Sequence, residues 1–177
     1  QTDIIKKAFA LKNIKAVVIS INSPGGSPVQ SNLLYDLIRS QAEEKKVKVI
    51  TYAEDVAASG GYWIALAGDK ILANPSTMTG SIGIYAGKVD LSRLNQWVGI
   101  RETVIKTNEK ADQNGSHRGY TEAERQRMQN NLRDYYRIFL ERVSESRHLD
   151  IKKVEEVAQG RVYTGAQALN FKLIDQL

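Results

Sequence analysis

Two strand-like runs in this chain each end at a glycine turn that leads into a helix-like stretch. Residues 16–21 are rich in β-branched side chains and precede a Pro-Gly-Gly turn, after which residues 28–43 have the spacing of an amphipathic helix. The apolar run 47–53 is followed by a Ser-Gly-Gly turn and a helix-like stretch at 60–67. Such alternation is typical of βαβ units. The sequence therefore predicts an α/β fold with a mostly parallel sheet flanked by helices.

The rest of the chain continues this alternation. Thr121 and Glu124 have the spacing of a capping box, which predicts a long amphipathic helix from there to about Arg147. The polar segment 106–119 is expected to be an exposed, mobile loop. With 177 residues, we expect one domain over residues 1–177. Further helices are expected at residues 4–11, 90–98 and 150–160 and after Thr164, and further strands at 70–73, 82–85, 102–106 and 161–163.

The composition excludes several kinds of site. The net charge is +5, but lysine and arginine are interleaved with acidic residues, so no basic stripe indicates a nucleic-acid partner. The chain has no cysteine, which excludes disulfides, thiolate nucleophiles and cysteine metal ligands. His117 and His148 both lie in polar stretches without the spacing of metal ligands. We therefore expect neither a metal nor a cofactor.

Ser59 is the strongest candidate for a catalytic residue. It lies between a strand-like run and the helix-like stretch that begins at Gly60, so its hydroxyl is expected to face the unpaired N–H groups and the positive dipole of a helix start. This position suits a nucleophile whose attack creates an oxyanion. The alternative is an ordinary N-cap serine followed by a glycine turn.

Two other turns are candidate parts of the same site. If neighbouring strands bring the turn in residues 21–27 and the Ser59 turn to one sheet edge, the Gly26 and Gly60 amides together can bind an oxyanion. The alternatives for the first turn are a simple strand-to-helix connection and a phosphate loop, and the phosphate loop lacks its lysine and glycine spacing. In residues 74–84, Ser81 lies between two glycines and is a candidate contact to a catalytic group.

Three strings resemble the signal peptide peptidase A family of serine proteases. They occur in the order INSPGGS, AASGGYWIA and NPSTMTGSIGI, and the later string QGRVYTG also resembles a segment of that family. The resemblance covers nearly the whole chain from about Ile14 and implies the Clp protease and crotonase-like fold. It also implies a bacterial protein anchored in the cell membrane, with its catalytic domain outside the cytoplasm, that degrades signal peptides and forms ring- or dome-like homo-oligomers.

The chain itself has no obvious membrane anchor. No run approaches the roughly 20 apolar residues of a membrane span, and the sequence begins at Gln1 rather than at a methionine. We therefore expect this chain to be a catalytic fragment of a longer, anchored protein.

The resemblance also assigns roles to individual residues. It implies that Ser59 is the nucleophile, that Gly60 and Gly26 line the oxyanion hole, and that Ser81 helps to hold the general base. In this family the base is a lysine in the polar loop before the long helix. Aligned without gaps, that position falls on Ala111, and Lys110 is one residue away.

Three interpretations of Ala111 are open. A one-residue shift in the loop makes Lys110 the base, in preference to Lys106. Alternatively, alanine has replaced the lysine and the enzyme is inactive, or the base comes from another half of a longer protein, as in double-module family members.

The expected function is a Ser–Lys endopeptidase that degrades remnant signal peptides. The alternatives are a non-catalytic peptide-binding or assembly module and a crotonase-like acyl-CoA enzyme, which needs the same oxyanion hole.

Overall fold

The computed structural model describes residues 2–177 and contains two compact units. The first, which we call the sheet unit, runs to Ile84 and resumes at Tyr135–Leu177. The second, the loop unit, is Tyr85–Asp134. None of the helices in residues 2–177 has both the length and the apolar character needed to cross a bilayer.

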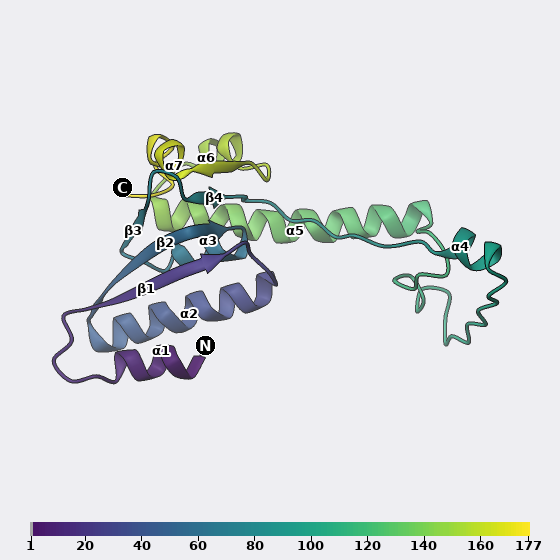
Figure 1. The fold of residues 1–177 in the computed structure, drawn as a ribbon, viewed down its shortest axis with the longest axis horizontal. Coiled ribbons are helices and arrows are strands. Elements are labelled where there is room, and N and C mark those ends of the chain that lie inside the picture. The colour runs from purple at the N-terminus through teal and green to yellow at the C-terminus, as the bar shows by residue number, and fades with distance from the viewer. Residues whose placement is uncertain (1) are drawn as a thin grey trace. The chain divides into compact units, whose positions relative to one another are not determined.

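The sheet unit is organised around five strands (Figure 1). They are β1 (Ala16–Ser23), β2 (Lys48–Ala58), β3 (Lys70–Ala73), β4 (Met78–Gly80) and β5 (Val162–Thr164). Strands β1, β3 and β4 all pair in parallel with β2, whereas β5 pairs antiparallel with β4. Together with the helices below, this confirms the predicted α/β fold with a mostly parallel sheet.

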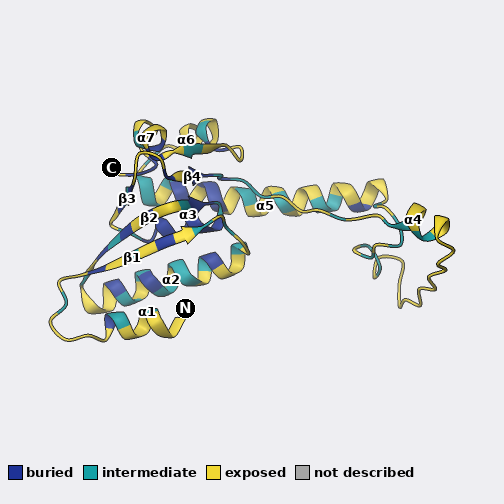
Figure 2. Cartoon of the chain, in the orientation of Figure 1, coloured by how far each residue is buried: buried dark blue, intermediate teal, exposed yellow. Residues whose placement is uncertain are grey.

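Helices cover one face of β1 and β2. Val17 and Val49 point into the core, whereas their neighbours on the opposite face, such as Val18 at 64% exposure, are open to solvent (Figure 2). Helix α1 packs beside α2, and the Trp63 ring of α3 stacks on Phe139 of α5 with 4.6 Å between ring centroids. The helices of this unit are α1 (Thr2–Phe9), α2 (Pro28–Lys45), α3 (Gly60–Ala65), the later part of α5 (Glu122–Arg147), α6 (Ile151–Val157) and α7 (Gly165–Asn170).

The loop unit has little regular structure. It contains α4 (Ser92–Trp97) and the first turns of α5, and no strand lies within Tyr85–Asp134. The predicted capping box at the start of α5 is present, because Thr121 Oγ1 accepts a hydrogen bond from Glu124 N at 3.3 Å and Thr121 N donates to Glu124 Oε2 at 2.8 Å. This pair ends the preceding loop and begins the helix.

Two predicted strands are wrong. Residues 82–85 form no strand, because the strand in this region is β4 and the chain turns away after it, with φ of +83° at Gly80 and +50° at Ser81. Residues 102–106 are β-branched in part but pair with no strand in the described chain. A β-branched run alone does not make a strand when no partner edge lies beside it.

Candidate active site

Ser59 is the single residue between β2 and α3. Its φ of +52° and ψ of −121° lie in a region that non-glycine residues rarely adopt. Backbone hydrogen bonds hold this conformation on both sides: Ser59 N donates to Gly80 O at 2.9 Å, and Ser59 O accepts from Trp63 N at 2.9 Å. The Ser59 hydroxyl makes no capping hydrogen bond to α3, so the side-chain cap considered as an alternative is absent.

The turn after β1 packs directly against Ser59. Ser23 Oγ accepts a hydrogen bond from Gly25 N at 3.2 Å, and Gly25 has a φ of +124°. A Cβ atom at Gly25 would lie 2.7 Å from Ser59 Cβ and 3.1 Å from both Ser59 Oγ and Gly60 N, so only glycine fits. Because β1 and β2 are adjacent parallel strands, their carboxyl ends meet at one sheet edge, as the predicted site requires.

Two backbone amides converge beside this serine. A Cβ atom at Gly60 would lie 3.1 Å from Gly26 N, so the Gly26 and Gly60 amides border the same small space. Neither amide donates a hydrogen bond to another residue of the described chain. Two free N–H groups next to a serine hydroxyl can donate hydrogen bonds to the oxygen of a carbonyl under attack.

Ser81 flanks the site on the β4 side. Ala58 of β2 pairs with Gly80 of β4. Ser59 directly follows Ala58, and Ser81 directly follows Gly80. Ser81 N donates to Arg161 O at 2.7 Å, which ties this turn to the start of β5. The Ser81 hydroxyl has no hydrogen-bond partner between residues 2 and 177 and is therefore free to contact another group.

A groove of about 380 Å³ opens beside the glycine turns. Gly25, Gly26 and Gly60 line it, together with the buried Ser31. Its apolar lining comes from α1, β1, α2 and α3 through Ile4, Ile5, Ile21, Leu34 and Ile64. The groove therefore offers an apolar surface next to the two amides, which suits an aliphatic side chain of a peptide.

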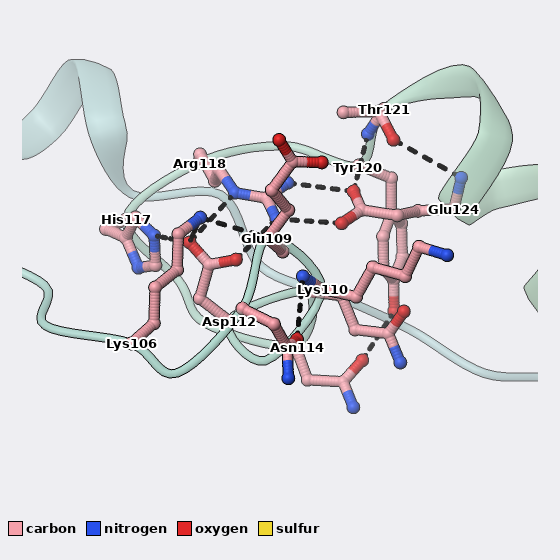
Figure 3. Close-up of polar contacts among 12 residues, drawn as sticks. Lys106, Glu109, Lys110, Asp112, Asn114, His117, Arg118, Tyr120, Thr121 and Glu124 are labelled. Carbon is pink, nitrogen blue, oxygen red and sulfur yellow. Dashed lines mark hydrogen bonds and ion pairs between the residues drawn. The ribbon is translucent and has the colours of Figure 1, made fainter.

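The loop unit holds the residues considered for the base. Lys110 and Ala111 are both exposed, and no hydrogen bond joins the Lys110 ammonium to another described residue (Figure 3). Lys106 Nζ, in contrast, contacts Asp112 Oδ2 at 3.1 Å and Glu109 O at 3.3 Å. Lys106 is already paired with the Asp112 carboxylate, which makes it the poorer candidate for a base.

Asp112 and Glu124 are joined through Arg118. The Arg118 guanidinium lies 2.8 Å from Asp112 Oδ1 and 2.8 Å from each oxygen of Glu124, and His117 Nε2 is 3.1 Å from Asp112 Oδ2 (Figure 3). The side chains of Asp112 and Glu124 are only 8% and 6% exposed. The expectation that the whole of residues 106–119 is exposed is therefore wrong, because this network buries Asp112.

Hydrogen bonds from Arg118 keep both carboxylates ionised. They hold the pKa of Asp112 well below its ordinary value, with smaller contributions from Lys106 and His117. They lower the pKa of Glu124 to about 2, with help from the Thr121 amide. The same contacts raise the pKa of Arg118. The three charges therefore persist at neutral pH and fix Asp112, the neighbour of Ala111, to the start of α5.

No metal centre is evident in residues 2–177, because no group of three or more histidine or acidic side chains converges there. Asp112 and Glu124 are paired with Arg118 instead.

Comparison with known proteins gives the family. A model described as Peptidase family S49 matches residues 41–177. The chain belongs to peptidase family S49. This match includes the Ser59 turn, the Ser81 turn and the loop unit.

Curated relatives match nearly the whole chain. The chain is 38% identical to the chloroplastic serine protease SPPA of Arabidopsis thaliana over 97% of its length and 25% of that protein. It is 33% identical to a putative signal peptide peptidase SppA of Enterococcus faecium over 98% of its length and 50% of that protein. It is also 38% identical to 24% of a protein named Na(+)/H(+) antiporter NhaA from Brucella melitensis. The chain thus spans between a quarter and a half of these relatives.

The S49 chain brings together most of the residues that its sequence singles out. Ser59, Gly26 and Gly60 meet at one point, with Ser81 on the adjoining strand end. The sequence gives no sign of Ser31, because a serine inside an amphipathic helix carries no signal of its position beside another turn. Its position in the groove beside Gly60 is evident only in the folded chain, where α2 packs against α3.

Proposed function

We propose that this chain carries the nucleophile of an S49 serine endopeptidase. Ser59 Oγ attacks the carbonyl carbon of a peptide bond, and the Gly26 and Gly60 amides bind the oxyanion that forms. The leaving amine takes the proton that Ser59 has given up to the base. Water then hydrolyses the acyl ester on Ser59. The observation that carries this proposal is the meeting of the Ser59 hydroxyl, the Gly60 amide and the Gly26 amide around one small space.

The proposed base is a lysine that takes the proton of Ser59. Its amine must be neutral, which requires its pKa to fall by about three units from 10.4, through burial or a nearby cation. Lys110 is our first candidate, because its ammonium is not committed to another described group, whereas Lys106 is paired with Asp112. The alternatives are a lysine replaced by Ala111 and a base supplied by another domain or subunit.

The proposed substrates are extended hydrophobic peptides, including remnant signal peptides. The apolar lining of the groove beside the amides supports this class. So does the printed name of the Enterococcus faecium relative, a putative signal peptide peptidase. We further propose that the longer protein is a bacterial, membrane-anchored homo-oligomer whose peptidase domain lies outside the cytoplasm and needs no cofactor.

A fluorophosphonate probe tests the nucleophile. We expect it to label the chain once, at Ser59, and we expect Ser59→Ala to abolish the label, as seen by intact mass and peptide mapping. Labelling at another residue would falsify the assignment of Ser59. The same holds if a longer form of the protein that includes this chain is not labelled at all.

Two substitutions separate the possible sources of the base. If Lys110 is the base, Lys110→Ala removes peptide hydrolysis, whereas Ala111→Lys has little effect. If the lysine has been replaced, Ala111→Lys increases hydrolysis by at least about a hundredfold, as expected for gain of a general base. If neither substitution changes the rate, the base comes from outside this chain.

The second candidate function is a peptide-binding module without catalysis. Ala111, at the position where the resemblance expects lysine, is the observation that favours it. Peptide binding without Ser59 labelling would support this candidate. The match to a peptidase family favours both peptide functions over the acyl-CoA enzyme.

A further inference from the structure

Ser31 differs from the other serines associated with α2. Ser27 caps the helix and accepts a hydrogen bond from Gln30 N at 3.4 Å, and Ser40 Oγ donates to Leu37 O at 3.0 Å. Ser31 is 5% exposed, yet its hydroxyl bonds to nothing else in residues 2–177. A serine within a helix ordinarily uses its hydroxyl on a nearby carbonyl of the same helix. Ser31 therefore holds a free hydroxyl in a nearly buried place.

The free hydroxyl lies beside Gly60, on the side of Gly60 where the Gly26 amide also lies. A Cβ atom at Gly60 would lie 2.5 Å from Ser31 Oγ and 3.1 Å from Gly26 N. The hydroxyl and the Gly26 amide thus border the same small space beside Gly60. Ser31, Gly26 and Gly60 also line the same groove, which gives this space an opening through which a ligand atom can enter.

The buried side-chain nitrogen and oxygen atoms without a partner in residues 2–177 are Trp63 Nε1 and Arg142 Nε, so the Ser31 hydroxyl is not sealed off. Because Ser31 lines the groove, its hydroxyl can bind a polar atom that enters there. The Gly26 and Gly60 amides offer donors only, so an oxygen atom is the group that can satisfy all three positions at once. A hydroxyl can rotate to donate to such an oxygen, and a serine side chain is an established kind of oxyanion donor.

We propose that Ser31 Oγ donates a third hydrogen bond to the carbonyl oxygen that enters the space between the Gly26 and Gly60 amides. This inference rests on the proposed function. The bond strengthens as that oxygen gains negative charge, and Ser31 neither forms a covalent bond nor gives up its proton. Ser31 therefore acts mainly on the acylation step and less on the initial binding of the peptide.

Ser31→Ala is the direct test, with Ser40→Ala as a matched control in the same helix. Alanine is the best helix former, so the variant is expected to fold. In the fluorophosphonate assay the phosphoryl oxygen takes the place of the carbonyl oxygen. We expect Ser31→Ala to lower the first-order rate of Ser59 labelling by about tenfold, as for loss of one donor to a charged oxygen, without weakening the initial complex. The Ser40→Ala control is expected to label at the wild-type rate.

A second measurement does not require a reactive Ser59. The probe is acetyl-trileucine with a free carboxylate, which resembles a cleavage product and places an anionic oxygen at the amides. Calorimetric titration is expected to show about tenfold weaker binding to Ser31→Ala and unchanged binding to Ser40→Ala.

The outcomes separate the two proposals. If wild-type Ser59 is unreactive but Ser31→Ala weakens carboxylate binding, the peptidase proposal fails and the role of Ser31 stands. If wild-type Ser59 is labelled and Ser31→Ala matches the wild type in both assays, the role of Ser31 is wrong and the peptidase proposal stands. A Ser31→Ala effect that appears only in the melting temperature also overturns the inference, because it indicates packing alone.

Discussion

The Ser59 turn and the 106–119 loop are built in opposite ways. Around Ser59, glycine backbones approach so closely that an added Cβ atom would lie 2.5 to 3.1 Å from its neighbours, and the contacts are made by uncharged groups. In the loop, the Arg118 guanidinium bridges two carboxylates that are almost fully buried. We infer that the serine turn is sensitive to added atoms and insensitive to charge, whereas the loop is sensitive to the loss of charge.

The largest expected effect comes from adding one methyl group to the serine turn. Gly60→Ala suits the helix conformation, but its Cβ would lie 2.5 Å from Ser31 Oγ and 3.1 Å from Gly26 N and would fill the proposed oxyanion space. We expect Ser59 labelling to slow by at least about a hundredfold, as for loss of an oxyanion donor. Gly87→Ala is the control, because its Cβ would have no atom within 4 Å. Equal labelling of both variants would contradict a backbone-built site.

The same contrast explains what the sequence could predict. The serine turn is encoded locally, by glycines directly after two strand-like runs. The sequence could therefore predict that Ser59, Gly26 and Gly60 meet at one sheet edge if the two strands are neighbours, and the pairing of β1 with β2 meets that condition. The surroundings of Ser31 and Asp112 depend on which residues from other segments lie nearby in the folded chain. The spacing of apolar and polar residues in the sequence does not indicate this. The strand wrongly predicted at 102–106 failed for a related reason, since a strand needs a partner that only the fold supplies.

A smaller effect is expected from removing one charge of the loop. Asp112→Asn keeps the shape of the side chain but removes its negative charge, so its ion pair with Arg118 is lost. We expect trypsin to cleave after Lys110 about tenfold faster, because loss of such a bond shifts the local opening equilibrium by about that factor. The control is Asp134→Asn, at an exposed position in α5. If the control is cleaved as fast as Asp112→Asn, net charge rather than the Arg118 network governs opening.

A smaller change still is expected at the start of α5. Thr121→Ala removes the side-chain cap on Glu124 N, which is worth about 1 kcal/mol in other helices. We expect the Glu124 and Arg125 amides to exchange with solvent deuterium about five times faster, without a change in Ser59 labelling. Thr121→Ser retains the hydroxyl and is expected to behave as the wild type. Faster exchange in the serine variant would show that the methyl group, not the cap, stabilises this turn.

The smallest effect is a response to acid that separates the two regions. Contacts with Arg118 lower the pKa of Glu124 from its ordinary 4.5 to about 2, so the stability that Glu124 contributes is complete above pH 4.5 and is lost as the pH falls toward 2. In NMR titrations, we expect the chemical shift of the Thr121 amide, which donates to Glu124, to change only below pH 4. We expect the chemical shift of the Ser59 amide, which donates to the Gly80 carbonyl, to stay unchanged. A Thr121 midpoint near 4.5 would indicate that Arg118 does not hold Glu124 in solution. A Ser59 shift with the same midpoint would mean that charges of the loop also act on the serine turn, and the two regions would then not be independent.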